Sequence, residues 1–94
     1  MKVHRQGKHV LVAICDAELL GRELRHGELT IKVSEHFYGG FRTDVEEALK
    51  LAEEANSVNL IGKRIVEAAV KRGLIHREAV IEVASVPHAI MVKV

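Results

Sequence analysis

The sequence predicts one α+β domain, residues 1–94, in which two consecutive helices pack on one face of a two-layer fold with a mainly antiparallel sheet of four to five strands. A length of 94 residues and an apolar fraction of 48% are enough for a single hydrophobic core. Strand-like segments stand towards both ends of the chain. Between them, apolar residues recur at helical spacing over residues 43–55 and 57–73. Strands that flank a helical pair are typical of α+β domains.

The first half of the chain predicts three strands. Residues 2–6 and 9–15 are expected to form a hairpin, and the second of these runs is apolar on both alternating faces, which indicates a central strand. Asp16 is placed to cap a single helical turn that ends at Gly21. Residues 28–33 alternate between apolar and polar side chains, which predicts a strand with one face in water.

Two helices are predicted in the middle of the chain. The first, residues 43–55, begins with a capping box that Thr43 and Glu46 form together. The second, residues 57–73, has Ser57 as its N-cap and a glycine at its C-terminal end. Because so few residues separate them, we expect either a tight helical hairpin or one kinked helix.

Gly62 is unusual because it falls on the buried side of the second predicted helix. A glycine inside a helix costs about 1 kcal/mol relative to alanine. We therefore expect another backbone, a large side chain or a ligand to lie close to the Cα of Gly62. After this helix, residues 79–84 and 88–94 are predicted to be strands, and Pro87, which lacks an amide donor, suits the start of the last one.

The net charge of the chain is only +1, so its total charge does not predict a strong electrostatic attraction to nucleic acid. Cations do cluster between residues 63 and 77, which makes Lys63 and Lys71 weak candidates for nucleic-acid contacts. The alternative is a solvated helix face on which these two lysines flank Glu67 at i,i+4 spacing.

Composition also bears on the compartment. A single cysteine excludes an internal disulfide, and we find neither a signal peptide nor a run of eighteen apolar residues. We therefore expect a cytoplasmic protein with no membrane partner. Charged residues reach 29%, while the amides number one Gln and two Asn, a bias typical of thermophilic proteins.

The aromatic residues Phe37, Tyr38 and Phe41 are the only ones in the chain, and they surround Gly39 and Gly40. Exposed rings over flexible glycines can stack on bases or anchor a protein partner. The alternative is that one ring fills the end of the core beneath the loop.

Three motifs are predicted to share one surface site, namely the aromatic loop, Asn59 and Pro87–His88. Asn59 is expected in the first turn of the second helix, near amides that can hold an anion, or else it bridges the helical junction. His88 follows the bend at Pro87 and supplies a group that changes with pH. The alternative is that each motif serves its own turn. The candidate binding residues are Phe37, Tyr38, Gly39, Gly40, Asn59, Gly62, Pro87 and His88.

The sequence predicts neither a metal site nor a cofactor. Six histidines are present, but none has the spacing of a zinc motif. No catalytic motif stands out, and Cys15 is more typical of a small buried apolar residue than of a nucleophile.

The order of these motifs resembles a small archaeal protein family of unknown function. The segments that carry the resemblance, which spans His9 to Val94, are Cys15–Asp16, Leu19–Gly21, Phe37–Gly40, Asn59–Gly62 and Pro87–Ala89. The resemblance implies an archaeal, cytosolic protein and carries no activity.

The function that these observations favour is a non-catalytic binding module rather than an enzyme. The leading hypothesis is binding of RNA or a ribonucleoprotein through the aromatic loop and a basic face. A protein-interaction or self-association module is the alternative, and a small enzyme that uses His88 or His36 is the third.

Overall fold

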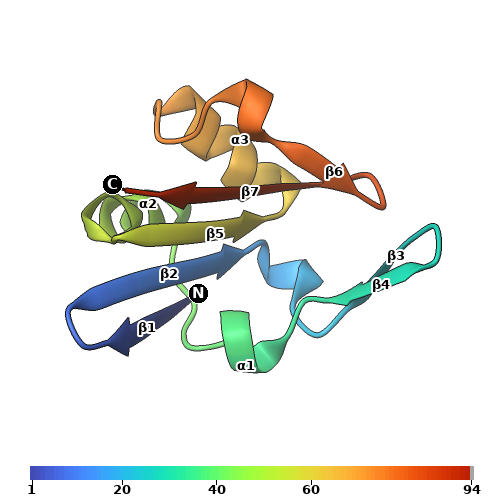
Figure 1. Cartoon of the computed structure of the whole chain (residues 1–94), viewed down its shortest axis with the longest axis horizontal. Helices are drawn as coiled ribbons and strands as arrows, with labels where there is room; N and C mark the ends of the chain where they lie inside the picture. Colours follow the sequence, from blue (N-terminus) through green and yellow to red (C-terminus); the bar gives the residue numbers. More distant parts are fainter. Residues whose placement is uncertain (94) are drawn as a thin grey trace.

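The structure is a computed structural model that describes residues 1–93. Its main sheet has five strands in the order β1-β2-β5-β7-β6 (Figure 1). Its strands are β1 (Lys2–Gln6), β2 (His9–Cys15), β5 (Ser57–Ile61), β6 (Ile81–Val83) and β7 (Val86–Val92). β2 and β5 run parallel, and the other three neighbouring pairs are antiparallel. The α+β class and the mainly antiparallel sheet are therefore confirmed.

Helices and a separate hairpin complete the chain. They are the 3₁₀ turn η1 (Ala17–Leu19), the hairpin strands β3 (Glu23–His26) and β4 (Leu29–Lys32), the helices α1 (Glu35–Tyr38), α2 (Val45–Glu54) and α3 (Lys63–Lys71), and the 3₁₀ turn η2 (Arg77–Ala79). The predicted hairpin of β1 with β2 is confirmed. The predicted strand over residues 28–33 is also present, but it pairs with β3 outside the main sheet.

The prediction of one helix over residues 57–73 is wrong in its first third. Residues 57–61 form β5, which lies between β2 and β7, and the helix begins only at Lys63. Ser57 is therefore the first residue of a strand and not an N-cap. The two long helices are separated by a strand, so they form neither a helical hairpin nor a kinked helix.

The helix predicted from residue 43 starts one residue later than the capping box required. The carboxylate of Asp44 accepts a hydrogen bond from the Glu47 amide at 2.9 Å, so Asp44 and not Thr43 caps α2. The C-terminal end of α3 agrees with the prediction, because Gly73 follows it with a φ of +79°.

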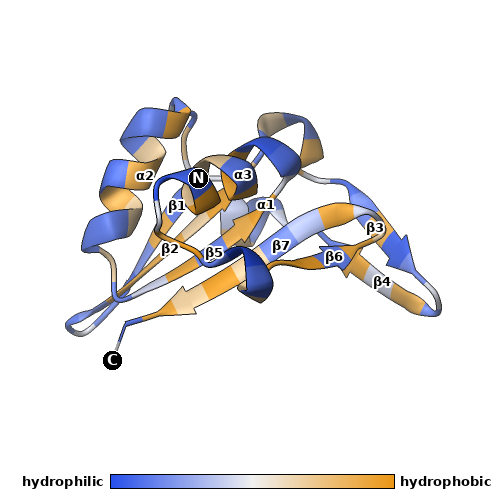
Figure 2. Ribbon diagram, turned by 90° about the horizontal axis from the view of Figure 1, so that it is seen from above, coloured by the Kyte–Doolittle hydropathy of each residue, from blue (hydrophilic) through white to orange (hydrophobic). Residues whose placement is uncertain are grey.

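One face of the sheet, which we call the helical face, packs against α2 and α3 (Figure 2). Val12, Val58 and Leu60 point from β2 and β5 into this layer. They join Leu49 of α2 and Val66 of α3 in one core, and each of these five side chains is at most 2% exposed. This burial of strand residues against two helices accounts for most of the hydrophobic stabilisation.

The opposite face, which we call the open face, is only partly covered. At one end, Ala13 and Ile61 of the sheet pack with Tyr38 of α1 and Leu24 of β3 in a second, smaller core. At the other end of β7, Ile90 and Val92 remain 56% and 63% exposed. A sheet residue on this face can therefore be reached from solvent.

Candidate binding site

A hydrogen-bonded cluster on the open face brings three of the predicted residues together. The side-chain oxygen Oδ1 of Asn59 accepts a hydrogen bond from the hydroxyl of Tyr38 at 2.5 Å. The same oxygen lies 3.1 Å from Nε2 of His88. Tyr38, Asn59 and His88 come from α1, β5 and β7, so segments far apart in the sequence meet at one point, which we call the Tyr38–Asn59–His88 cluster.

The register of the sheet explains why Asn59 and His88 meet. Asn59 alternates with Val58 and Leu60, which face the helices, so its side chain projects from the open face. His88 stands opposite Ile61 on the neighbouring strand, and directly paired residues share a face. The prediction that Asn59 begins a helix is wrong, because this residue sits in the middle of β5.

Tyr38 reaches the cluster from a short helix that is fixed at both ends. The hydroxyl of Ser34 accepts hydrogen bonds from the amides of His36 and Phe37, at 3.1 and 3.3 Å, and so caps α1. The ring of Tyr38 then fills the second core and is only 7% exposed. This is the alternative in which a ring of the loop closes one end of the core.

Burial keeps both titratable members of the cluster neutral at neutral pH. It is the main cause that raises the pKa of Tyr38 to about 12, with a smaller contribution from Cys15. It also lowers the pKa of His88 from the ordinary value of 6.5. An amide oxygen can only accept, so both Tyr38 and His88 donate to Asn59, which fixes the proton of His88 on Nε2.

The other two aromatic rings lie beside the cluster in different environments. Phe37 is half-buried and stacks on His4 with ring centroids 5.0 Å apart, and it meets Tyr38 edge to face at 4.9 Å. Phe41 is 47% exposed. His4, which the sequence did not single out, also bonds through Nε2 to the carbonyl oxygen of Phe37 at 2.7 Å.

Gly39 and Gly40 serve close packing in this structure. A Cβ on Gly40 would lie 2.8 Å from the carbonyl oxygen of Met1, and one on Gly39 would lie 2.7 Å from that of Glu35. The amide of Gly40 donates to the same Met1 oxygen at 3.1 Å. Both glycines are therefore required by neighbouring backbone, which is a structural account of the motif.

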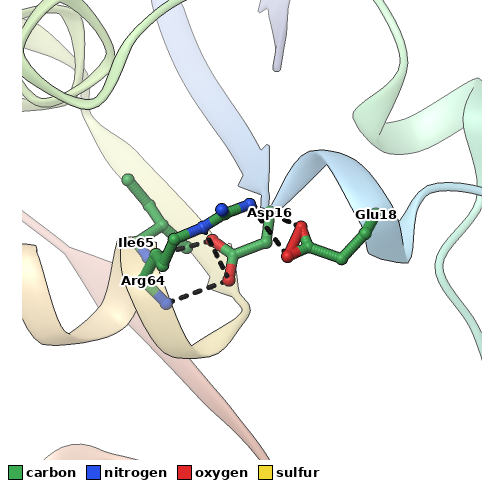
Figure 3. A network of polar contacts seen from close by, with 4 residues as sticks. All are labelled: Asp16, Glu18, Arg64 and Ile65. Atoms are coloured by element: carbon green, nitrogen blue, oxygen red, sulfur yellow. Dashed lines mark hydrogen bonds and ion pairs between the residues drawn. The ribbon is translucent and has the colours of Figure 1, made fainter.

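Gly62 is buried as predicted, but the group packed against it is the carboxylate of Asp16. Figure 3 shows this carboxylate with the residues that it binds, Arg64 and Ile65. A Cβ on Gly62 would lie 2.7 Å from Oδ2 of Asp16, and its φ of +126° is a region that favours glycine. The two oxygens of Asp16 accept hydrogen bonds from the amides of Arg64 and Ile65 at 2.9 and 3.0 Å.

Asp16 therefore caps α3 from another strand instead of capping its own turn. No side-chain hydrogen bond from Asp16 caps η1. Because Asp16 holds amides at the start of α3, this helix N-terminus is already supplied with an anion. The role of Asp16 was missed in the sequence, although Cys15–Asp16 and Ile61–Gly62 each end a buried strand.

A cleft of about 620 Å³ opens next to Asp16, between α1 and the first turns of α2 and α3. Its lining includes Cys15, Tyr38, Gly40 and Phe41, so it borders the buried side of the aromatic loop. Burial raises the pKa of the Cys15 thiol, which keeps the thiol protonated at neutral pH. A protonated thiol is a poor nucleophile.

Lys63 and Lys71 lie at opposite ends of α3 and are both exposed. Lys63 lines a small hollow of about 150 Å³ with Pro87, at the start of β7. The neighbouring arginines are paired with carboxylates, which reduces the positive field of this segment. The pairs are Arg64 with Glu18, Arg72 with Glu46 and Glu53, and Arg77 with Glu67.

Residues 1–93 contain no group of three or more His, Cys, Asp or Glu side chains placed to hold a metal ion. Within the same range, no helix is long and apolar enough to cross a membrane. His36 is exposed on α1, and no hydroxyl or thiol in the described residues forms a hydrogen bond to its ring or to that of His88.

Comparison with known proteins gives a family and a solved fold. The family described as protein of unknown function (DUF424) matches residues 4–94. The crystal structure of an uncharacterized conserved protein from Methanopyrus kandleri, an archaeon, has a TM-score of 0.82 and 29% sequence identity, covering 99% of this chain and 90% of that chain. No curated protein matches. The resemblance to an archaeal family is thereby confirmed, and the chain belongs to the DUF424 family of proteins of unknown function.

Proposed function

We propose that this protein is a non-catalytic module that binds single-stranded RNA, alone or within a ribonucleoprotein, on the open face of its sheet. The observation that carries the proposal is the Tyr38–Asn59–His88 cluster, which places polar groups in the middle of a sheet face that is only partly covered. A sheet face with aromatic and amide side chains is a common platform for unpaired bases.

The surroundings of the cluster suit flat, apolar ligands. Ile90 stands opposite Asn59 in the sheet, and Ile81 stands opposite His88, with exposures of 56% and 57%. On the other side of the cluster lies the half-buried ring of Phe37, which stacks on His4 and meets Tyr38 edge to face. Bases stack on such surfaces with little regard to sequence, because every base has an apolar face.

Phosphate contacts are assigned to Lys63 ahead of Lys71. Both lysines are on α3, in the helical layer, but Lys63 stands at the end of the helix that adjoins Pro87 at the start of β7, in a hollow that Asp16 and Glu18 also line. With a net charge of +1, binding rests on few phosphate contacts, and a modest salt dependence follows.

The test is fluorescence anisotropy of a short, labelled oligouridine at several salt concentrations. Asn59→Ala should weaken binding about tenfold or more, a loss of about 1.4 kcal/mol. Asn56→Ala is the matched control, because it removes an amide that bonds to the Val10 backbone at the other end of β5. Lys63→Glu should lower the salt slope by about 1. Absence of binding at low salt, or equal losses in both asparagine variants, would contradict the proposal.

Self-association is the second candidate function, and the exposure of Ile90 and Val92 favours it. These two residues lie on the same side of β7, outside the cover of α1 and the β3–β4 hairpin. Adjacent exposed apolar side chains on a sheet are a recognised feature of protein contacts.

A further inference from the structure

The side-chain nitrogen Nδ2 of Asn59 is a hydrogen-bond donor, and its amide group is held in one orientation. Its oxygen Oδ1 already accepts from two donors, Tyr38 and His88. Within residues 1–93, every buried side-chain nitrogen and oxygen has a hydrogen-bond partner, and Nδ2 of Asn59 forms no bond there. Nδ2 is therefore not fully buried, and it has protons to donate to a ligand.

The outward nitrogen of His88 is an acceptor for the same reason. Its Nε2 donates to Asn59, so in the neutral ring Nδ1 carries the lone pair. No bond is formed by Nδ1 within the described residues, and it is not among buried atoms left without a partner. A donor on Asn59 and an acceptor on His88 thus belong to hydrogen-bonded side chains of neighbouring strands on the open face.

We propose that Asn59 and His88 read the hydrogen-bonding edge of one unpaired nucleobase, an inference that rests on the proposed RNA binding. In uracil, the carbonyl O4 would accept from Nδ2 of Asn59 while N3–H donates to Nδ1 of His88. A base in a duplex has this edge occupied, so the site selects single strands. Tyr38 acts as a positioning residue, because its hydroxyl holds the amide oxygen inward.

We assign a base rather than a peptide because apolar side chains border the hydrogen-bonding groups of the cluster. Phe37 packs edge to face on Tyr38 on one side, and the exposed Ile81 and Ile90 border the cluster on the other. A planar ring can contact these surfaces while its edge meets the cluster. A peptide that pairs with the sheet as an added strand needs an edge strand. Asn59 lies on β5, which is an inner strand.

The experiment compares oligouridine with the same oligomer made from N3-methyluridine, which keeps the base stacking surface and both carbonyls but lacks N3–H. The native protein should bind oligouridine about tenfold more tightly, the effect of one hydrogen bond with a well-formed partner. Tyr38→Phe should bring this ratio close to one while the protein remains folded. Phe41→Leu, an aromatic change outside the cluster, should leave the ratio unchanged.

The outcomes separate this inference from the function on which it rests. Equal affinity for the two oligomers overturns edge reading and leaves RNA binding in place. Failure of both oligomers to bind overturns the proposed function as well. A ratio that survives in Tyr38→Phe overturns the positioning role of the tyrosine.

Discussion

At the scale of single residues, the contact between Gly62 and Asp16 has a measurable energetic consequence. Gly62→Ala places a Cβ against the Asp16 carboxylate and forces alanine to adopt a φ of +126°. Overpacking and backbone strain of this kind cost about 1–3 kcal/mol each. Urea unfolding should therefore show a free energy of unfolding lower by about that amount or more.

Gly73→Ala is the control for that prediction. Gly73 also has a positive φ, +79°, but a Cβ there meets nothing within 4 Å. Its cost should be confined to backbone strain and remain clearly smaller than that of Gly62→Ala. Equal losses in the two variants would show that the Asp16 contact contributes nothing.

The burial of His88 predicts a loss of stability in mild acid. Burial lowers the pKa of His88 below 6.5, so the unfolded chain takes up a proton more readily than the folded protein. This contribution to stability is complete above pH 6.5 and is lost as the pH falls through the folded pKa. The melting temperature should decline between pH 6.5 and 5, and less steeply in His88→Gln. If His88→Gln has the same profile as the native protein, the ring is not buried as described.

At the scale of elements, α2 provides a direct comparison between a sequence pattern and a structure. The pattern favours Thr43 as the cap, whereas the structure gives that role to Asp44. Asp44→Ala should lower the free energy of unfolding by about 1 kcal/mol, and Thr43→Ala by a few tenths. Thermal or urea unfolding of the two variants measures the difference. A larger loss in Thr43→Ala would restore the capping box.

The helix predicted over residues 57–73 shows why part of the fold could not be predicted. Val58 and Ile61 match a helical stripe, yet in β5 they face opposite sides of the sheet. In a run of five residues, Val58 and Leu60 fit strand alternation while Val58 and Ile61 fit helical spacing, so periodicity does not separate the two. The break at Gly62 was visible in the sequence, but its positive φ was not.

Of the candidate site, the meeting of three motifs could be predicted, but not the hydrogen bonds that join them. The motifs at Tyr38, Asn59 and His88 were expected to meet, and their side chains do so. The hydrogen bonds that join them depend on the register of β5 with β7, which no local pattern specifies. Gly39, Gly40 and Gly62 are packing residues: Gly39 lies against the backbone of Glu35 one turn earlier, Gly40 against that of Met1, and Gly62 against the side chain of Asp16.

At the scale of the whole molecule, the exposed end of β7 tests the second candidate function. If the protein self-associates through Ile90 and Val92, Ile90→Lys should shift the molecular mass towards that of the monomer, because a charge would then be buried in the contact. Sedimentation equilibrium over a range of concentrations measures the mass. Leu51→Lys, on α2 and 37% exposed, is the control. A monomeric native protein at all concentrations would exclude this function.

The cap of α3 by Asp16 also bears on how the protein folds. Asp16 and Ile65 are 49 residues apart in the chain, and they meet only after β2 and β5 have paired in parallel. Helices of nine residues are marginal in water, so α3 depends on this distant carboxylate and on its packing. A peptide of residues 57–73 should accordingly show no helical circular dichroism on its own. The stability of α3 is therefore coupled to the parallel pairing of β2 with β5, which brings its distant cap into place.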